Sequence, residues 1–263
     1  MGLWLVESLL LRRALNSKKL DMIRSGNPAL KGSIFTGVQA VSGENAMTIQ
    51  GTTNKTIISL GLVILTASWA WANPQIAAPF LWPAVIGGFI VAIVTVFKKE
   101  WAPITAPIYA AVEGVALGLI SLVFEKSFPG IVKQAVALTF CVLFSLLIIY
   151  KSRLIKPTEN FKLGVFAATG GIALIYLVSI VMGFFGGRIP FIHDSGPIGI
   201  GFSIFVVIIA ALNLVMDFDF IEKGAEYGAP KYMEWYGAFG LIVTLVWLYL
   251  EILRLLAKLQ SRR

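Results

Sequence analysis

The chain has 263 residues, of which 57% are hydrophobic and only 14% are charged. Soluble domains average about 25% charged residues, so this composition argues against a soluble protein and favours one embedded in a bilayer. A formal net charge of +8 is compatible with nucleic-acid binding. However, the basic residues fall between long apolar runs, as in the loops of a membrane protein, and we expect no nucleic-acid partner.

Residues 1–55 are mixed and polar, and we expect them to form a partly ordered cytoplasmic arm. Downstream, apolar runs reach the roughly 17–25 residues that a helix needs to span a bilayer. These runs cover 56–73, 78–97, 104–124, 132–150, 163–184, 197–220 and 236–257. Helices are expected because lipid cannot satisfy the backbone polar groups of an irregular segment. The sequence therefore predicts an all-α integral membrane bundle of about seven transmembrane helices over 56–258, followed by a basic tail, 259–263.

The distribution of lysine and arginine indicates the orientation of the bundle. If the N-terminal arm is cytoplasmic, the loops on its side carry most of the basic residues, so the positive-inside rule predicts a cytoplasmic N-terminus. Seven spans would then place the C-terminus outside. The basic C-terminal end, with Arg254, Lys258 and Arg262, argues for the opposite side. An even number of spans or a re-entrant last helix therefore stays an alternative.

Small residues recur within the predicted helices, as in Gly87-Gly88, Gly114 to Gly118 and Gly170-Gly171. In membranes, small residues allow helix backbones to come into close contact. We interpret these glycines as packing positions.

Acidic residues inside the apolar runs are the most informative feature of the sequence. An ionised carboxylate is costly within a membrane, so such groups usually pair, stay protonated or line water. They are Glu113 in the third run, Asp217 and Asp219 toward the end of the sixth, and Glu251 in the seventh. Asn213 precedes Asp217 by four residues and shares its helix face. These five residues are the candidate functional positions.

Asp217 and Glu251 lie on helices that are adjacent in sequence, and we expect them to approach each other inside the bundle. Two close carboxylates in a low-dielectric site tend to share a proton, which makes the pair sensitive to pH. When deprotonated, the pair offers hard oxygen ligands suited to a cation such as calcium. Two alternatives stay open: Arg254 can pair with Glu251 as a structural anchor, and Asp219 can lie at the membrane surface.

Enzyme signatures are absent from the sequence, which lacks HExxH, GxSxG and the P-loop pattern GxxxxGK[ST]. A membrane protease of the presenilin type would need a GxGD sequence, which is absent as well. We therefore predict that the protein is not an enzyme and carries no resident cofactor.

Several segments carry a resemblance to a known family. They are 26–30 (GNPAL), 47–56 (MTIQGTTNKT), 106–114 (APIYAAVEG), 117–121 (LGLIS), 217–222 (DFDFIE), 228–240 (GAPKYMEWYGAFG) and 248–251 (LYLE). In order and spacing they resemble the bacterial YccA-like branch of the Bax inhibitor-1 family over nearly the whole chain.

The resemblance implies a central seventh helix surrounded by the other six, and a pH-sensitive calcium leak in a bacterial plasma membrane. By motif, Asp217 and Glu251 take the places of the two gating aspartates of the family. The chain departs from the family pattern at Met216, at Phe218-Asp219 and in having Glu rather than Asp at position 251. The alternative function is a non-transporting regulator that binds another membrane protein, such as a quality-control protease. Besides the lipid bilayer, the expected partners are thus calcium ions and protons, or a membrane protein.

Overall fold

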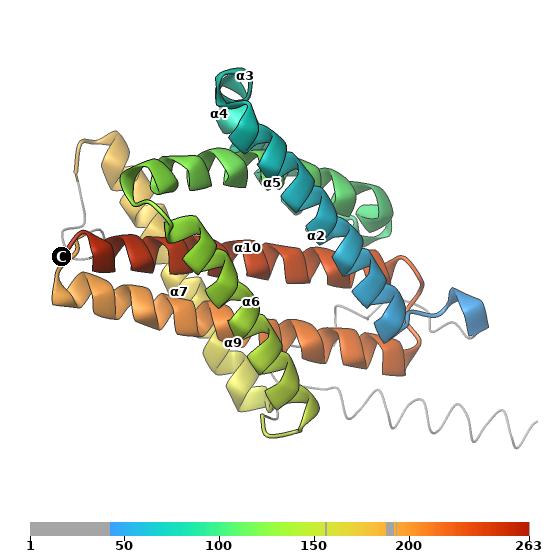
Figure 1. The fold of residues 1–263 in the computed structure, drawn as a ribbon. Coiled ribbons are helices and arrows are strands. Elements are labelled where there is room, and N and C mark those ends of the chain that lie inside the picture. Colours follow the sequence, from blue (N-terminus) through green and yellow to red (C-terminus); the bar gives the residue numbers. More distant parts are fainter. Residues whose placement is uncertain (1–42, 156, 188–191, 193, 263) are drawn as a thin grey trace, which may run out of the picture.

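The computed structural model describes residues 43–155, 157–187, 192 and 194–262. Within these residues the chain forms helices and no strand (Figure 1). The long helices are α2 Ile49–Ala72, α4 Leu81–Phe97, α5 Ala102–Ser127, α6 Ile131–Lys151, α7 Glu159–Phe184, α9 Pro197–Tyr227 and α10 Met233–Gln260. A short helix, α3 Pro74–Ala77, and one 3₁₀ turn connect α2 to α4.

Seven helical segments of the described chain are long and apolar enough to cross a membrane, which confirms the predicted membrane fold. The helices extend beyond the expected bounds at several ends. For example, α2 begins at Ile49 rather than at 56, because the Thr48 hydroxyl accepts a hydrogen bond from the N–H of Gly51 at 2.9 Å and caps the helix. Residues 49–55 of the expected N-terminal arm thus belong to α2, and residues 1–42 of that arm lie outside the described residues.

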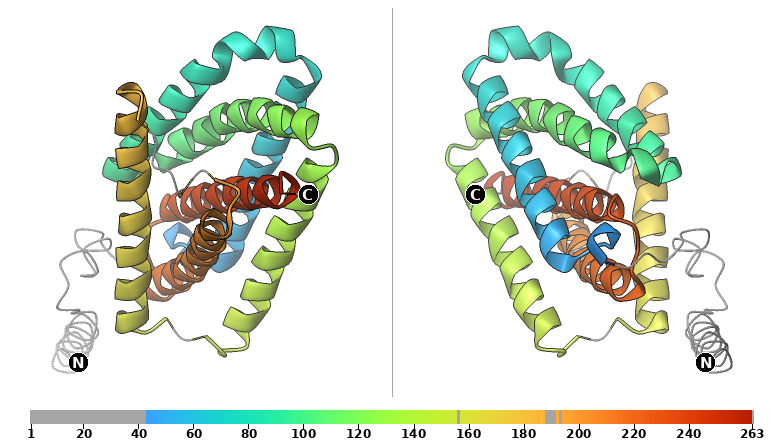
Figure 2. Two further views of the ribbon diagram at one scale, coloured as in Figure 1. Left: turned by 90° about the vertical axis from the view of Figure 1, so that its left-hand side faces the viewer. Right: turned by 90° about the vertical axis from the view of Figure 1, so that its right-hand side faces the viewer.

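The C-terminal helix α10 lies at the centre of the bundle (Figure 2). It packs against α2, α5, α6 and α9, and it is the most deeply buried of the seven spans. Leu248 and Leu253 of α10 are fully buried in a core that also contains Leu214 of α9. The central position implied for the last helix is therefore confirmed. The same helix extends to Gln260, into the expected basic tail, of which residue 263 lies outside the described part.

Helices α2 and α5 approach each other closely at Gly114 and Gly118, which lie four residues apart on one face of α5. A Cβ atom added at Gly118 would lie 2.3 Å from the carbonyl oxygen of Ala67, and one added at Gly114 would lie 2.5 Å from that of Val63. Glycine therefore allows a backbone contact that a larger residue would prevent, as in other small-xxx-small motifs. The predicted packing role of this pair is confirmed, whereas the glycines at 170–171 have open space around them.

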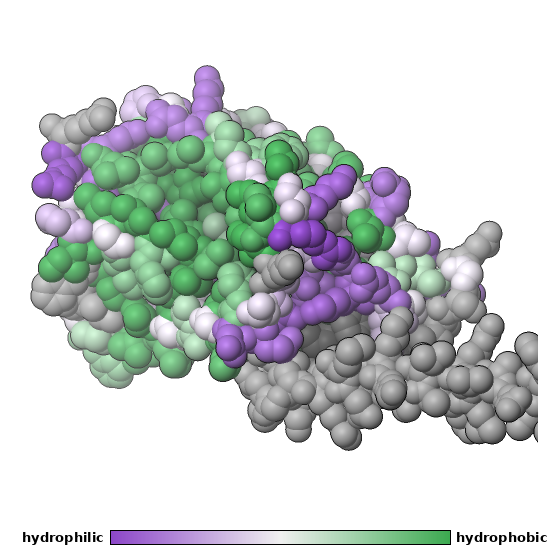
Figure 3. All heavy atoms as spheres, turned by 90° about the horizontal axis from the view of Figure 1, so that it is seen from below, coloured by the Kyte–Doolittle hydropathy of each residue, from purple (hydrophilic) through white to green (hydrophobic). Residues whose placement is uncertain are grey.

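The outer surface of the bundle is strongly apolar. On the face seen in Figure 3, hydrophobic residues form a broad area, with many of the hydrophilic residues gathered beside it. Large side chains such as Phe89 on α4, Leu174 on α7 and Phe205 on α9 are exposed. An apolar surface of this extent needs a lipid environment, so the protein contacts the bilayer through the outer faces of its helices.

Candidate functional site

Asp217 lies on α9 at the contact with α10. A Cβ atom added at Gly240 of α10 would lie 3.5 Å from the Asp217 Oδ1 atom, and the Thr244 hydroxyl is within hydrogen-bonding range of the carboxylate. The other oxygen, Oδ2, is buried and has no hydrogen-bond partner in the described part of the chain. A buried carboxylate oxygen without a partner is costly, so this position favours a proton or a cation.

Glu251 is almost fully buried on α10 and has a complete set of partners. The hydroxyl of Tyr176, on α7, lies 3.0 Å from each of its carboxylate oxygens. Arg254 Nη1 lies 2.8 Å from Glu251 Oε1 and 2.8 Å from the Tyr176 hydroxyl. The ion pair that the alternative interpretation expects between Arg254 and Glu251 is therefore present. The cluster of Tyr176, Glu251 and Arg254 also joins α7 to the central helix.

The structure does not bring Asp217 and Glu251 together. Asp217 faces Gly240 and Thr244, and Thr244 precedes Glu251 by seven residues, which is about 10 Å along a helix. Asp217 and Glu251 thus lie at different positions along the helix axes and do not form the expected carboxylate pair. Helical periodicity fixes the face on which each acid lies, but the axial shift between α9 and α10 separates them.

The surroundings of these acids also bear on metal binding, within the part of the chain that the structure describes. Within the described residues, no group of three or more His, Cys, Asp or Glu side chains is placed to hold a metal ion. Calcium usually takes six to eight oxygen ligands. Asp217 and Glu251 therefore belong to no such cluster within the described residues, and a role for them in binding calcium stays a prediction.

Two further predicted residues join α9 to α7. Asp219 is buried near the C-terminal end of α9 and forms ion pairs with Lys162 of α7 at 2.9 Å and Lys223 at 2.8 Å. Asn213 donates a hydrogen bond to the Thr169 hydroxyl of α7 at 2.8 Å. Asp219 is therefore a buried ion-pair partner of two lysines near the end of α9.

Glu113 lies apart from the other acids. It is on α5 and faces α4, where a Cβ atom added at Gly88 would lie 2.9 Å from its Oε2 atom. The absence of a side chain at Gly88 thus leaves room for the carboxylate between α4 and α5.

The contacts of α7 form a line of polar groups across the membrane. Lys162, Thr169 and Tyr176 are spaced by seven residues and contact Asp219, Asn213 and Glu251 in turn. From Lys162 to Tyr176 the line covers 14 residues of α7, or about 21 Å along the helix, compared with a hydrocarbon core of roughly 30 Å. We call these six residues the polar seam.

Beyond the polar seam, Lys258 of α10 is buried among polar partners. Its ammonium group donates to the carbonyl oxygens of Ile192 and Gly199, at 2.5 and 3.0 Å, and to the Ser203 hydroxyl at 2.9 Å. Polar contacts therefore continue between α9 and α10 to the end opposite Asp219.

Glu234 is a buried acid that the sequence pattern did not single out. It is completely buried at the start of α10, where the N–H and hydroxyl groups of Thr48 donate to it at 2.9 and 2.8 Å. It also forms ion pairs with Lys55 and, at 3.2 Å, with Lys231. These contacts fix the start of α2 against the start of α10. The available signal was its place in the first turn of a helix, where an acid is favoured.

Comparison with known proteins agrees with this architecture. The family described as Bax inhibitor 1 like matches residues 27–261, which is nearly the whole chain. A search of curated proteins found no match. The matched region contains all seven membrane-spanning segments and the polar groups described above. The chain therefore belongs to the Bax inhibitor-1-like family.

Proposed function

We propose that this protein is a pH-sensitive cation leak in the plasma membrane, with calcium as the expected cation. Asp217 is its charge sensor, and the polar seam is its route across the bilayer. The observation that carries the proposal is the buried Asp217 Oδ2 atom, which lacks a hydrogen-bond partner in the described residues.

The cost of charge at Asp217 supports a role in gating. Ionisation places a negative charge inside the membrane, and the described residues around it offer the Thr244 hydroxyl but no basic partner. Such a charge is stabilised by water or by a cation, whereas a proton removes it. Protonation of Asp217 at lower pH therefore favours a dry contact between α9 and α10. Ionisation at higher pH favours a contact that holds water or a cation.

The packing of α7 supports the proposed route. This helix has the smallest buried share of the seven spans, and it packs mainly against α9. Ile172 of α7 packs with Val206 and Ile209 in a small apolar cluster, and Phe161 packs against the main core. The polar seam adds an ion pair and hydrogen bonds, and its side chains can bind water or a cation when α7 moves away. A modest movement of α7 would thus expose a polar path about 21 Å long.

Calcium flux into dye-loaded proteoliposomes tests the proposal. For the wild type we expect flux that differs between about pH 6 and about pH 8, and Asp217→Asn should abolish that difference because the amide does not titrate. Glu226→Gln is the matched control, because Glu226 is an exposed acid at the end of the same helix. It should keep the pH response.

Two outcomes would count against the leak. Equal pH responses in Asp217→Asn and the wild type would remove Asp217 as the sensor. No flux above empty liposomes, with folded protein confirmed, would refute conduction and favour the non-transporting regulator that binds another membrane protein.

We also propose that the ends of α2 and α10 marked by Ile49 and Met233 face the cytoplasm. The loops on that side carry Lys98, Lys99 and Lys151, as the positive-inside rule requires. After Cys141→Ser, an impermeant maleimide applied to intact cells should label Pro129→Cys but not Glu226→Cys. The opposite pattern would invert the orientation.

A further inference from the structure

We propose that a groove between α2 and α6 binds one acyl chain of an anionic phospholipid, with the headgroup at Lys133. The groove is a cavity of about 540 Å³ bounded by α2, α5, α6 and α10. This inference concerns lipid binding and does not depend on ion conduction.

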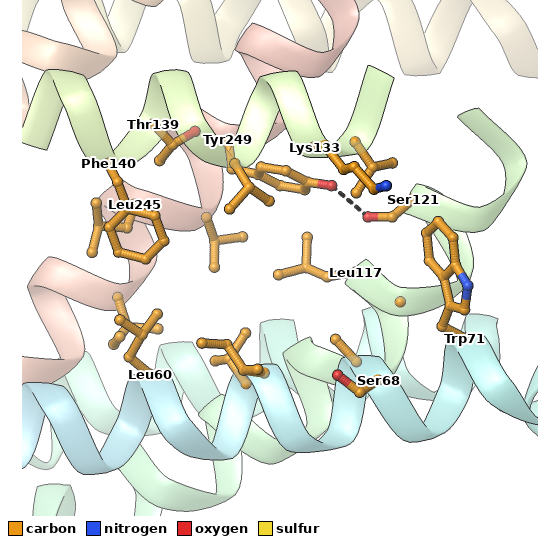
Figure 4. Close-up of a pocket in the computed structure, with 18 of the residues that line it drawn as sticks. Leu60, Ser68, Trp71, Leu117, Ser121, Lys133, Thr139, Phe140, Leu245 and Tyr249 are labelled. Carbon is orange, nitrogen blue, oxygen red and sulfur yellow. Dashed lines mark hydrogen bonds between the residues drawn. The ribbon is translucent and has the colours of Figure 1, made fainter. Parts of the chain in front are cut away.

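The groove has the chemistry of a hydrocarbon site. Aliphatic and aromatic side chains dominate its lining, including Leu60, Leu117 and Leu245, whose positions are seen in Figure 4. Two hydroxyls at its inner wall, on Ser121 and Tyr249, lie 2.6 Å apart and hydrogen-bond each other, so neither requires water (Figure 4). Apolar cavities disfavour water because they offer it few polar partners, and an engineered cavity of this kind binds small apolar molecules instead. The apolar lining of the groove therefore suits a hydrocarbon chain better than water.

The groove is open toward the lipid side of the bundle. Ile64 of α2 and Val136 of α6 line the groove, and these two residues are 51% and 40% exposed. Both belong to helices whose outer faces contact the bilayer. An acyl chain can therefore enter sideways from the membrane without crossing a polar barrier.

The length and depth of the groove match one leaflet. Along α2 its lining extends from Trp71 to Leu60, which is eleven residues or about 16 Å. Half of a roughly 30 Å hydrocarbon core is about 15 Å. Trp71 lies one residue before the end of α2, and Lys133 lies in the first turn of α6, so both mark the membrane surface. Leu60 lies near the middle of α2, where the tail of a lipid would end.

The positive charge of Lys133, at the membrane-surface end of the groove, favours an anionic headgroup. Lys133 is exposed and forms no ion pair within the described residues. The nearby acid Glu125 is already engaged, because the N–H groups of Gly130 and Val132 donate to it at 2.7 and 3.1 Å. The ammonium group is thus available to a phosphate, and Trp71 provides the aromatic contact usual at this depth.

Native mass spectrometry of the purified full-length chain, titrated with phosphatidylglycerol or phosphatidylcholine, tests the proposal. We expect one tightly bound phosphatidylglycerol and weaker binding of phosphatidylcholine. Lys133→Gln should reduce affinity for phosphatidylglycerol about fivefold, the effect of one lysine at an anionic surface, and should leave phosphatidylcholine unchanged. Lys151→Gln, at the other end of α6, is the control and should change neither.

A second pair of variants tests the groove itself. Val136→Trp should fill it and abolish the tightly bound lipid. Leu138→Trp should not, because Leu138 is similarly exposed on α6 but does not line the groove. Thermal unfolding confirms that each variant is folded. Should Val136→Trp fail to fold, Ile64→Trp fills the same groove from α2.

Three results would overturn the proposal. The first is equal lipid binding by Val136→Trp and Leu138→Trp. The second is an unchanged preference for phosphatidylglycerol in Lys133→Gln. The third is a wild type that proves dimeric in detergent and becomes monomeric in Val136→Trp with no change in bound lipid, which would assign the groove to a second copy of the chain.

Discussion

The contact between α2 and α5 allows a quantitative prediction for Gly118→Ala. The added Cβ atom would lie 2.3 Å from the carbonyl oxygen of Ala67, whereas ordinary contacts begin near 3.4 Å, so the backbones must separate by about 1 Å. The neighbouring atom belongs to the backbone of α2 and cannot rotate away. Overpacking of this kind typically costs about 1–3 kcal/mol, and we expect the free energy of unfolding to fall by that amount.

Gly170→Ala is the matched control, because it makes the same chemical change on a helix where the added methyl group meets open space. Alanine has a higher helix propensity than glycine. The free energy of unfolding of this variant should therefore equal that of the wild type or exceed it by up to about 1 kcal/mol. Both variants would be measured by reversible unfolding in mixed detergent micelles. Equal stabilities for the two variants would show that α2 and α5 are not in the close contact described here.

Three further substitutions address the buried polar groups. Glu234→Gln should lower the free energy of unfolding by about 2–4 kcal/mol, because two lysines lose a buried partner, whereas the exposed Glu226→Gln should change it by less than about 0.5 kcal/mol. Lys258→Met should cost about 1–3 kcal/mol, because it leaves two carbonyl groups and a hydroxyl without their donor; an unchanged melting temperature would contradict this. Tyr176→Phe should cost about 1–2 kcal/mol and loosen α7, which faster hydrogen exchange in that helix would reveal.

The number of spans could be predicted from the residues, whereas the central place of the last helix was implied only by the family resemblance. In lipid, each spanning segment must satisfy its own backbone, so hydropathy along the chain is a strong signal. Helix ends were less predictable. Residues 49–55 are mostly polar, which favours an arm in a hydropathy reading, yet they form the first turns of α2. The buried Glu234 binds Thr48 and Lys55, and it lies 186 residues from Thr48 and 179 from Lys55.

Helical periodicity located the polar helix faces but not their partners. It placed Asn213 and Asp217 on one face of α9, and placed Glu251 on one face of α10. It could not show the axial shift that sets Asp217 against Gly240 and Thr244. Periodicity could not identify the partners on α7 either, because Tyr176 lies 75 residues from Glu251 in the sequence.

The different surroundings of the two acids lead to a final prediction. Glu251 receives hydrogen bonds at both oxygens and an ion pair, so its charge is compensated and its main effect is to hold α7. Asp217 has one carboxylate oxygen without a hydrogen-bond partner among the described residues. Binding of a proton or a cation therefore stabilises Asp217 more than it stabilises Glu251. Glu251→Gln should therefore lower the free energy of unfolding by about 2 kcal/mol and keep the pH response of flux. Asp217→Asn should show the reverse, with near-normal stability and no pH response. Loss of the pH response in Glu251→Gln alone would instead make Glu251 the sensor.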